Sequence, residues 1–134
     1  MREFKFRAWH RERKCWVNTL HIYEDGSWCA GIQEERGLVE GYDERECDLM
    51  QYTGLHDRLG KKVFEGDIIK YFQADACQIP AEVYWDKSQS GFRLATGGDR
   101  QFGKTRLLLF AKIGEVIGNV HENPELLEDK STQA

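Results

Sequence analysis

Short runs of β-branched and aromatic residues alternate with glycine between residues 50 and 72. The runs 49–53, 61–64 and 68–72 predict strands, because such side chains suit a pleated, half-buried surface. Strands this short, joined by compact turns, predict a small closed β-barrel, which leaves few exposed sheet edges. Three glycines mark the predicted turns: Gly54, Gly60 and Gly66.

Other segments predict further short strands. The alternation of apolar and polar residues over 4–9 predicts a strand at the start of the chain. Asp25-Gly26 lies between two apolar runs and predicts a hairpin, since the tight turn needs positive φ. A second hairpin is predicted around the turn 86–90, and a last strand at 116–120. The apolar run 107–111 fits either helix or strand, and its short length favours a strand.

These elements together predict a mainly β chain that consists of two parts. An N-terminal β-hairpin arm and an acidic, mobile connection (31–47) are predicted within residues 1–47. The barrel is predicted at 48–128. Within it Asn123, followed by proline, suits the start of a short helical turn. Residues 129–134 read as a flexible tail.

The composition fits a soluble chain of one domain or one elaborated barrel. The 134 residues are 40% hydrophobic and 31% charged. No apolar run approaches the roughly 18 residues of a membrane helix, and the charged start is unlike a secretory signal, so we expect a cytoplasmic protein without membrane contact. The four cysteines are too far apart for a zinc knuckle or a redox dithiol, and they are expected to be free thiols: Cys15, Cys29, Cys47 and Cys77.

The charge is unevenly distributed along the chain. Six basic and two acidic groups give residues 1–14 a net charge of +4, whereas seven acids and two arginines give residues 33–49 a net charge of −5. Opposite charges of this size predict that the two segments face each other, either within one subunit or across an interface.

Catalytic patterns are weak in this sequence. His56-Asp57 suggests an acid–base pair, but it lies in a predicted turn where aspartate commonly bonds its own backbone. Glu65 and Asp67 could bind a metal ion, yet a turn before a strand explains Asp67 more simply as a cap. The four histidines, scattered along the chain, have no ligand spacing. The sequence therefore predicts no catalytic residue, no metal site and no cofactor.

A candidate interaction surface lies on the N-terminal strand. Lys5, Arg7 and Trp9 share one face of it, with more basic residues following. Aromatic and basic side chains together can stack on bases and neutralise phosphates. Arginine and tryptophan are equally the residues of protein interfaces, and the acidic net charge favours a role in subunit packing or in the core over nucleic-acid binding.

Several motifs are distributed over nearly the whole chain: Lys5-Phe6-Arg7-Ala8-Trp9, Leu49 to Leu55 with Asp57 and Gly60, Phe64-Glu65-Gly66-Asp67-Ile68-Ile69, Val83 and Trp85 with Phe92, Val116-Ile117-Gly118-Asn119-Val120, and Glu122-Asn123-Pro124-Glu125-Leu126-Leu127. Together they resemble the YopX protein family, found mainly in phages and prophages. One departure is His10, where such proteins typically carry an acidic residue. The resemblance implies an SH3-type barrel in the C-terminal part, oligomeric assembly, and no established biochemical activity.

Three functions are therefore carried forward. The first is a non-enzymatic phage or prophage accessory protein that acts as an oligomeric protein-interaction module. The second is a nucleic-acid-binding barrel that uses Lys5, Arg7 and Trp9. The third and most remote is a metal-dependent hydrolase around His56, Glu65 and Asp67.

Overall fold

The computed structural model describes residues 3–72, 78–96 and 105–127. Within these ranges the chain is mainly β, with two short 3₁₀ helices. Its internal contacts divide it into an N-terminal unit, Phe4–Gln51, and a C-terminal unit that begins at Tyr52 and also takes in Glu3. The predicted tail at 129–134 lies outside the described residues.

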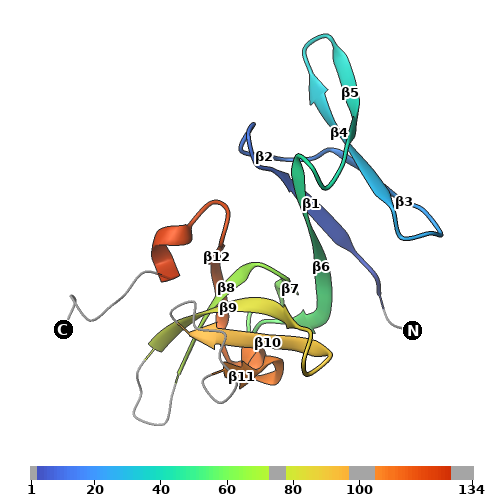
Figure 1. The fold of residues 1–134 in the computed structure, drawn as a ribbon. Helices are drawn as coiled ribbons and strands as arrows, with labels where there is room; N and C mark the ends of the chain where they lie inside the picture. The colour runs from blue at the N-terminus through green and yellow to red at the C-terminus, as the bar shows by residue number, and fades with distance from the viewer. Residues whose placement is uncertain (1–2, 73–77, 97–104, 128–134) are drawn as a thin grey trace. The chain divides into compact units, whose positions relative to one another are not determined.

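The N-terminal unit is built from two small antiparallel sheets. In one, β1 lies between β2 and β6, and in the other, β4 lies between β3 and β5 (Figure 1). The amide of Val17 donates to the carbonyl of Ala8 at 3.0 Å, and that of Asn18 donates to Gly31 at 2.8 Å. The strands are β1 (Phe6–His10), β2 (Cys15–Trp16), β3 (Thr19–Ile22), β4 (Trp28–Glu34), β5 (Gly37–Tyr42) and the first half of β6 (Cys47–His56).

The predicted hairpin at Asp25-Gly26 is confirmed. It joins β3 to β4, and Gly26 has a φ of 87°. Oδ1 of Asp25 accepts hydrogen bonds from the amide of Ser27 at 2.9 Å and from its hydroxyl at 2.6 Å. The hydroxyl bond, followed by the amide bond, lowers the pKa of the Asp25 carboxyl.

The structure differs from the sequence prediction at residues 31–47. In place of an irregular connection it has the end of β4, all of β5 and the first residue of β6. Ala30 and Ile32 on β4 are buried, which ties this hairpin to the core of the N-terminal unit. Among the acidic residues that suggested a loop, Glu34 is half-buried on β4 and Glu40 is exposed on β5, and the others of this range lie between the strands.

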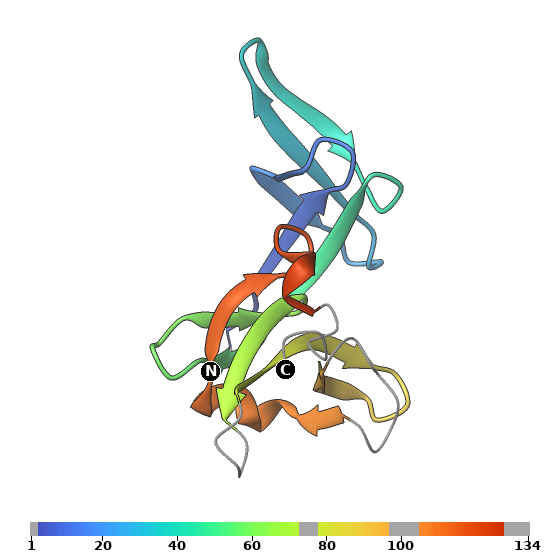
Figure 2. The same cartoon turned by 90° about the vertical axis from the view of Figure 1, so that its left-hand side faces the viewer.

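The C-terminal unit is a curled half-barrel sheet in the order β11-β10-β9-β8-β12 (Figure 2). β7 pairs with the second half of β6, and all neighbouring strands are antiparallel. The strands are β7 (Lys62–Phe64), β8 (Asp67–Phe72), β9 (Gln78–Asp86), β10 (Gly91–Thr96), β11 (Thr105–Leu107) and β12 (Glu115–Asn119), and the 3₁₀ helices are η1 (Leu108–Ile113) and η2 (Pro124–Leu127).

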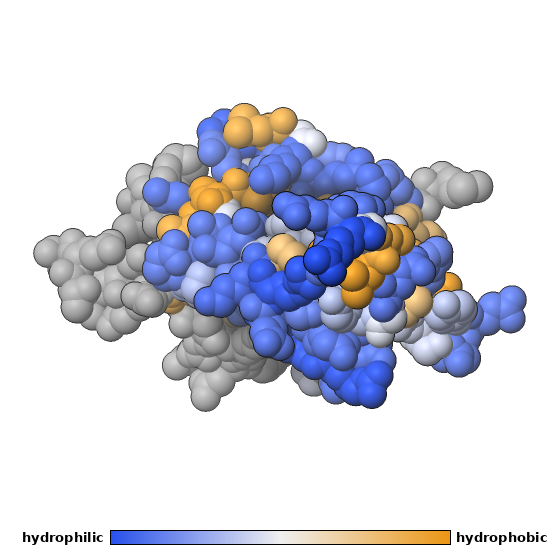
Figure 3. All heavy atoms as spheres, turned by 90° about the horizontal axis from the view of Figure 1, so that it is seen from above, coloured by the Kyte–Doolittle hydropathy of each residue, from blue (hydrophilic) through white to orange (hydrophobic). Residues whose placement is uncertain are grey.

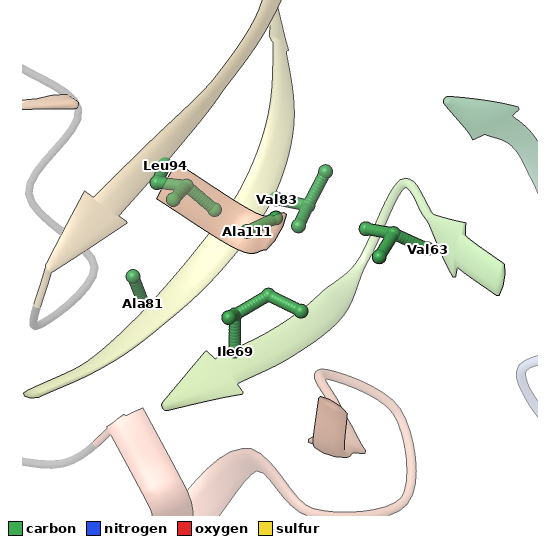
Figure 4. Close-up of a cluster of buried hydrophobic side chains, with 6 residues drawn as sticks. All are labelled: Val63, Ile69, Ala81, Val83, Leu94 and Ala111. Carbon is green, nitrogen blue, oxygen red and sulfur yellow. The ribbon is translucent and has the colours of Figure 1, made fainter. Parts of the chain in front are cut away.

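Six fully buried side chains form the core of this unit. Figure 4 shows them directed into one interior from β7, β8, β9, β10 and η1, and Val116 of β12 packs against them. The core residues are Val63, Ile69, Ala81, Val83, Leu94 and Ala111.

Two local predictions in this unit need correction. The run 107–111, expected as a strand, ends β11 and continues as η1, which brings Ala111 into the core. Gly54 was expected in a turn, but it lies inside β6 with a φ of 90°. The pairing of β6 with β7 shifts register between Tyr52 and His56. Gly54 lies at this irregularity, where its positive φ is accommodated because glycine has no side chain.

The end of β12 is closely packed, which makes Gly118→Ala informative. A Cβ atom on Gly118 would lie 2.5 Å from Oδ1 of Asn123, which accepts the amide of Asn119 at 3.3 Å. We expect a loss of about 1 kcal/mol in the free energy of unfolding, measured by urea denaturation. Gly91→Ala is the control, because its nearest neighbour is 3.8 Å away. Equal stabilities of the two variants would contradict this packing.

Candidate interaction surfaces

The three predicted surface residues of the N-terminal strand differ in exposure. Lys5 is exposed just before β1, and Arg7 is half-buried. Trp9 is only 8% exposed, and its neighbours Ala8 and His10, which point to the opposite face of β1, are buried as well, so both faces are covered there. Trp9 is therefore part of the core of the N-terminal unit and does not present its ring to a ligand.

Trp16 on β2 is the aromatic residue that accompanies Arg7. It lies opposite Trp9, with ring centroids 5.0 Å apart, and the guanidinium carbon of Arg7 lies 4.6 Å from the centre of its ring. The sequence interpretation missed Trp16. Pairing β1 with the strand after the turn 10–14 would have placed it beside Trp9.

The basic and acidic segments meet within the N-terminal unit. Nη1 of Arg11 donates to Oδ1 of Asp48 at 2.7 Å. Arg13 forms an ion pair with Glu34 and donates to the Tyr42 hydroxyl at 3.3 Å. The bond to Tyr42, and then Glu34, raises the pKa of Arg13. At least these two arginines are thus paired inside one subunit.

His10, the departure from the family pattern, closes the turn after β1. It is buried, and its Nδ1 accepts the amide of Arg13 at 3.0 Å. Its ring packs edge-on against Tyr42 with centroids 4.6 Å apart. An aspartate oxygen can accept the same amide of a turn, so the imidazole nitrogen replaces a carboxylate here without loss of the bond.

His56 and Asp57 do not form an acid–base pair. Nδ1 of exposed His56 lies 3.5 Å from the Tyr52 hydroxyl. The Asp57 carboxylate is buried and accepts three backbone amides, each at 2.9 Å: Leu59 and Lys61 on Oδ1, and Val116 on Oδ2.

The carboxylate of Asp57 is held in its charged form by these bonds. Burial alone raises its pKa, but the hydrogen bonds from the amides of Val116, Lys61 and Leu59 outweigh burial and lower the pKa below its ordinary value. Asp57 is the first residue of the loop between β6 and β7, and its carboxylate links this loop to β12. Its role is therefore structural.

Glu65 lies in the turn between β7 and β8, and Asp67 is the first residue of β8. Asp67 is buried, and its Oδ2 accepts the amide of Phe64 at 2.8 Å. Gly66 between them has a φ of 87°; its amide donates to the carbonyl of Val83 and its carbonyl accepts the amide of Val120, both at 2.8 Å. These contacts anchor the turn to β9 and to the chain after β12.

Metal and thiol chemistry have little support in the described residues. No group of three or more His, Cys, Asp or Glu side chains in 3–72, 78–96 and 105–127 could hold a metal ion. Burial raises the pKa of the Cys47 thiol to about 11, which keeps it protonated and unreactive at neutral pH. Cys15 and Cys29 are free and half-buried, and Cys77 lies outside the described residues.

An aromatic pair lies on the hairpin of β9 and β10. Trp85 and Phe92 face each other across the two strands, with ring centroids 5.0 Å apart and ring planes at 76°. They extend the row of the buried pair Val83 and Leu94, yet Trp85 is 45% exposed. A large ring braced in this way is typical of an interface anchor.

The exposed edge of β5 is a second candidate surface. Leu38 and Val39 are 42% and 38% exposed. The residues just before β5 line a polar hollow of about 500 Å³. On the face of the molecule drawn in Figure 3, apolar side chains form small separate areas among polar ones. The residues lining the hollow are Arg13, Gln33, Glu34, Glu35 and Arg36.

Comparison with known proteins places the chain in a family. The family model described as YopX protein matches residues 5–128. The chain belongs to the YopX family. The resemblance read from the sequence is therefore confirmed. A search of curated proteins found no match.

Two solved structures resemble this YopX family member along nearly their whole length. One is the crystal structure of protein EF1440 from Enterococcus faecalis, with 25% identity and a TM-score of 0.60, covering 96% of this chain and 100% of that chain. The other is protein yopX from Bacillus subtilis, with 25% identity and a TM-score of 0.62, covering 92% and 97%. None of these names states an activity.

One further finding concerns membranes. Among the residues that the structure describes, no helix has the length and apolar character needed to cross a membrane.

Proposed function

We propose that this chain is a non-enzymatic accessory protein, encoded by a phage or prophage and acting in the host cytoplasm as an oligomeric protein-interaction module. In this proposal the C-terminal part is an SH3-type barrel at 48–128, and the N-terminal arm at 1–47 is a separate part. The family relationship supports the proposal, since neither the family nor the two similar structures carry the name of an enzyme.

The proposal of self-association rests mainly on the partial exposure of Trp85. Its ring is held by Phe92 at 5.0 Å, so little side-chain entropy is left to lose when a partner covers it. Tryptophan is enriched among residues that dominate binding energies.

Self-association is tested by replacing that anchor. We expect Trp85→Ser to weaken the oligomer at least about tenfold, as measured by sedimentation equilibrium. Ile22→Ser is the matched control, because Ile22 is also 45% exposed but lies in the N-terminal unit. An oligomer unaffected by Trp85→Ser, or weakened equally by Ile22→Ser, would contradict the role of Trp85.

Nucleic-acid binding at the N-terminal strand is the second candidate. It is supported by exposed Lys5 beside Arg7, with Trp16 in place of the buried Trp9 as the aromatic partner. The ion pairs of Arg11 and Arg13 count against it, because these cations already have carboxylate partners. Binding of labelled single-stranded DNA that weakens steeply with salt and is lost in Arg7→Ala would favour this candidate over the first.

A further inference from the structure

The strand β5 forms an edge of its sheet. Within the residues that the structure describes, β5 pairs only with β4, so one side of its backbone has no strand partner. Figures 1 and 2 show the hairpin of β4 and β5 extending beyond β1 and β2 in the same unit. An edge of this kind can take an added strand.

Side chains on β5 do little to prevent such pairing. Natural edge strands are commonly protected by proline, lysine, a β-bulge or extreme shortness. β5 (Gly37–Tyr42) contains neither proline nor lysine, but its pairing with β4 shifts register after Val39, so the regular part of its edge is Gly37–Val39. Its exposed Leu38 and Val39 are adjacent in sequence, so they lie on opposite faces of the strand. An added strand could therefore bury apolar surface on both faces.

Charge indicates what kind of strand fits. Glu35 and Glu40 are exposed and form no ion pair in the described part of the chain, whereas Glu34 and Asp48 are paired with arginines. Arg36 is exposed next to Glu35 and offsets its charge, so the uncompensated carboxylate at the edge of β5 is that of Glu40. A second copy of β5 would bring two such carboxylates together, but a strand carrying lysine or arginine would neutralise the charge.

We propose that β5 accepts an extended segment of a partner protein, with alternating basic and apolar residues, as an additional strand. The main-chain hydrogen bonds of the added strand supply part of the affinity, and a lysine or arginine of that strand pairs with Glu40. The polar hollow beside Glu35 gives room for a side chain beyond the end of β5. This surface lies in the N-terminal unit, so it is independent of self-association at Trp85.

The probe is a fluorescent peptide of about ten residues that alternates lysine and valine. We expect saturable binding by anisotropy, together with slower amide hydrogen exchange at residues 37–42. Glu40→Lys should weaken binding at least about tenfold, whereas Glu125→Lys, an exposed position in the C-terminal unit, should change it less than about twofold. A peptide with prolines in place of the valines should not slow exchange, because it cannot complete the hydrogen bonds.

Several results would overturn the proposal. Equal affinity for Glu40→Lys and the native chain would remove the electrostatic argument. Binding without slower exchange at residues 37–42, or equal binding of the proline peptide, would show attraction without strand addition. Exchange at 37–42 that slows with protein concentration alone would show that a second copy occupies the edge. None of these results depends on the outcome for Trp85→Ser.

Discussion

Replacing Asp57 with alanine is expected to lower the free energy of unfolding by about 3 to 5 kcal/mol. The substitution removes the acceptor of three amides, those of Leu59, Lys61 and Val116. Asp57 itself is only 6% exposed, so water cannot easily replace the lost carboxylate. Each buried donor left without a partner costs about 1 to 3 kcal/mol. Urea denaturation followed by fluorescence measures the loss.

Asp86→Ala is the matched control for this prediction. Oδ1 of Asp86 also accepts three bonds, from the amide and hydroxyl of Ser88 and from the amide of Gln89. These donors belong to an exposed turn, where water can take the place of the carboxylate, and we expect a loss below about 1 kcal/mol. Similar losses in both variants would contradict the idea that burial makes Asp57 the more important residue.

The stability that Asp57 confers is also expected to depend on pH. Its pKa is lowered in the folded state, so its contribution is complete above the unfolded-state pKa of about 3.9 and is lost as the pH falls through the folded-state value. The native chain should therefore be more stable than Asp57→Asn at pH 6, and the difference should shrink as the pH falls toward 3.

Denaturation of both proteins across this pH range measures the difference directly. Other aspartates with lowered pKa values, such as Asp25, Asp43 and Asp86, are present in both proteins and cancel from the comparison. A gap between the native chain and Asp57→Asn that is constant from pH 6 to 3 would contradict a role for the charged carboxylate.

Features with a local cause could be predicted from the sequence. Asp25-Gly26 specifies its own turn, because the aspartate bonds within the turn and the glycine permits positive φ. The turn after Asp86 is confirmed, and the strand predicted at 116–120 is found as β12, Glu115–Asn119. In each case the residues that fix the conformation lie within a few positions of one another.

Features that depend on distant partners could not be predicted. Trp9 was grouped with Lys5 and Arg7 on a candidate interaction surface, with a place in the core as the alternative, because alternation alone does not show that both faces of β1 are covered. Residues 31–47 were expected to be a connection because their charges concealed the buried Ile32 among them and the buried Ala30 just before them. The partner of Asp57 on β12 is Val116, which lies 59 positions later.

The candidate surfaces also include features that local sequence predicts and features that only contacts between distant residues reveal. The N-terminal basic residues were found from their pattern, but only the fold shows Arg7 stacked on Trp16 and Arg13 paired with Glu34. Trp85 and Phe92 became a candidate anchor because β9 and β10 place them opposite each other, with Trp85 partly exposed. The edge position of β5 could be recognised only from the order of the strands in its sheet, β3-β4-β5.

The mass of the native chain in solution tests the central proposal most directly. Size-exclusion chromatography with light scattering, at concentrations on the order of tens of micromolar, reports that mass without any substitution. We predict a defined multiple of the mass of one chain, which decreases on dilution. A strict monomer over the whole concentration range would contradict an oligomeric interaction module.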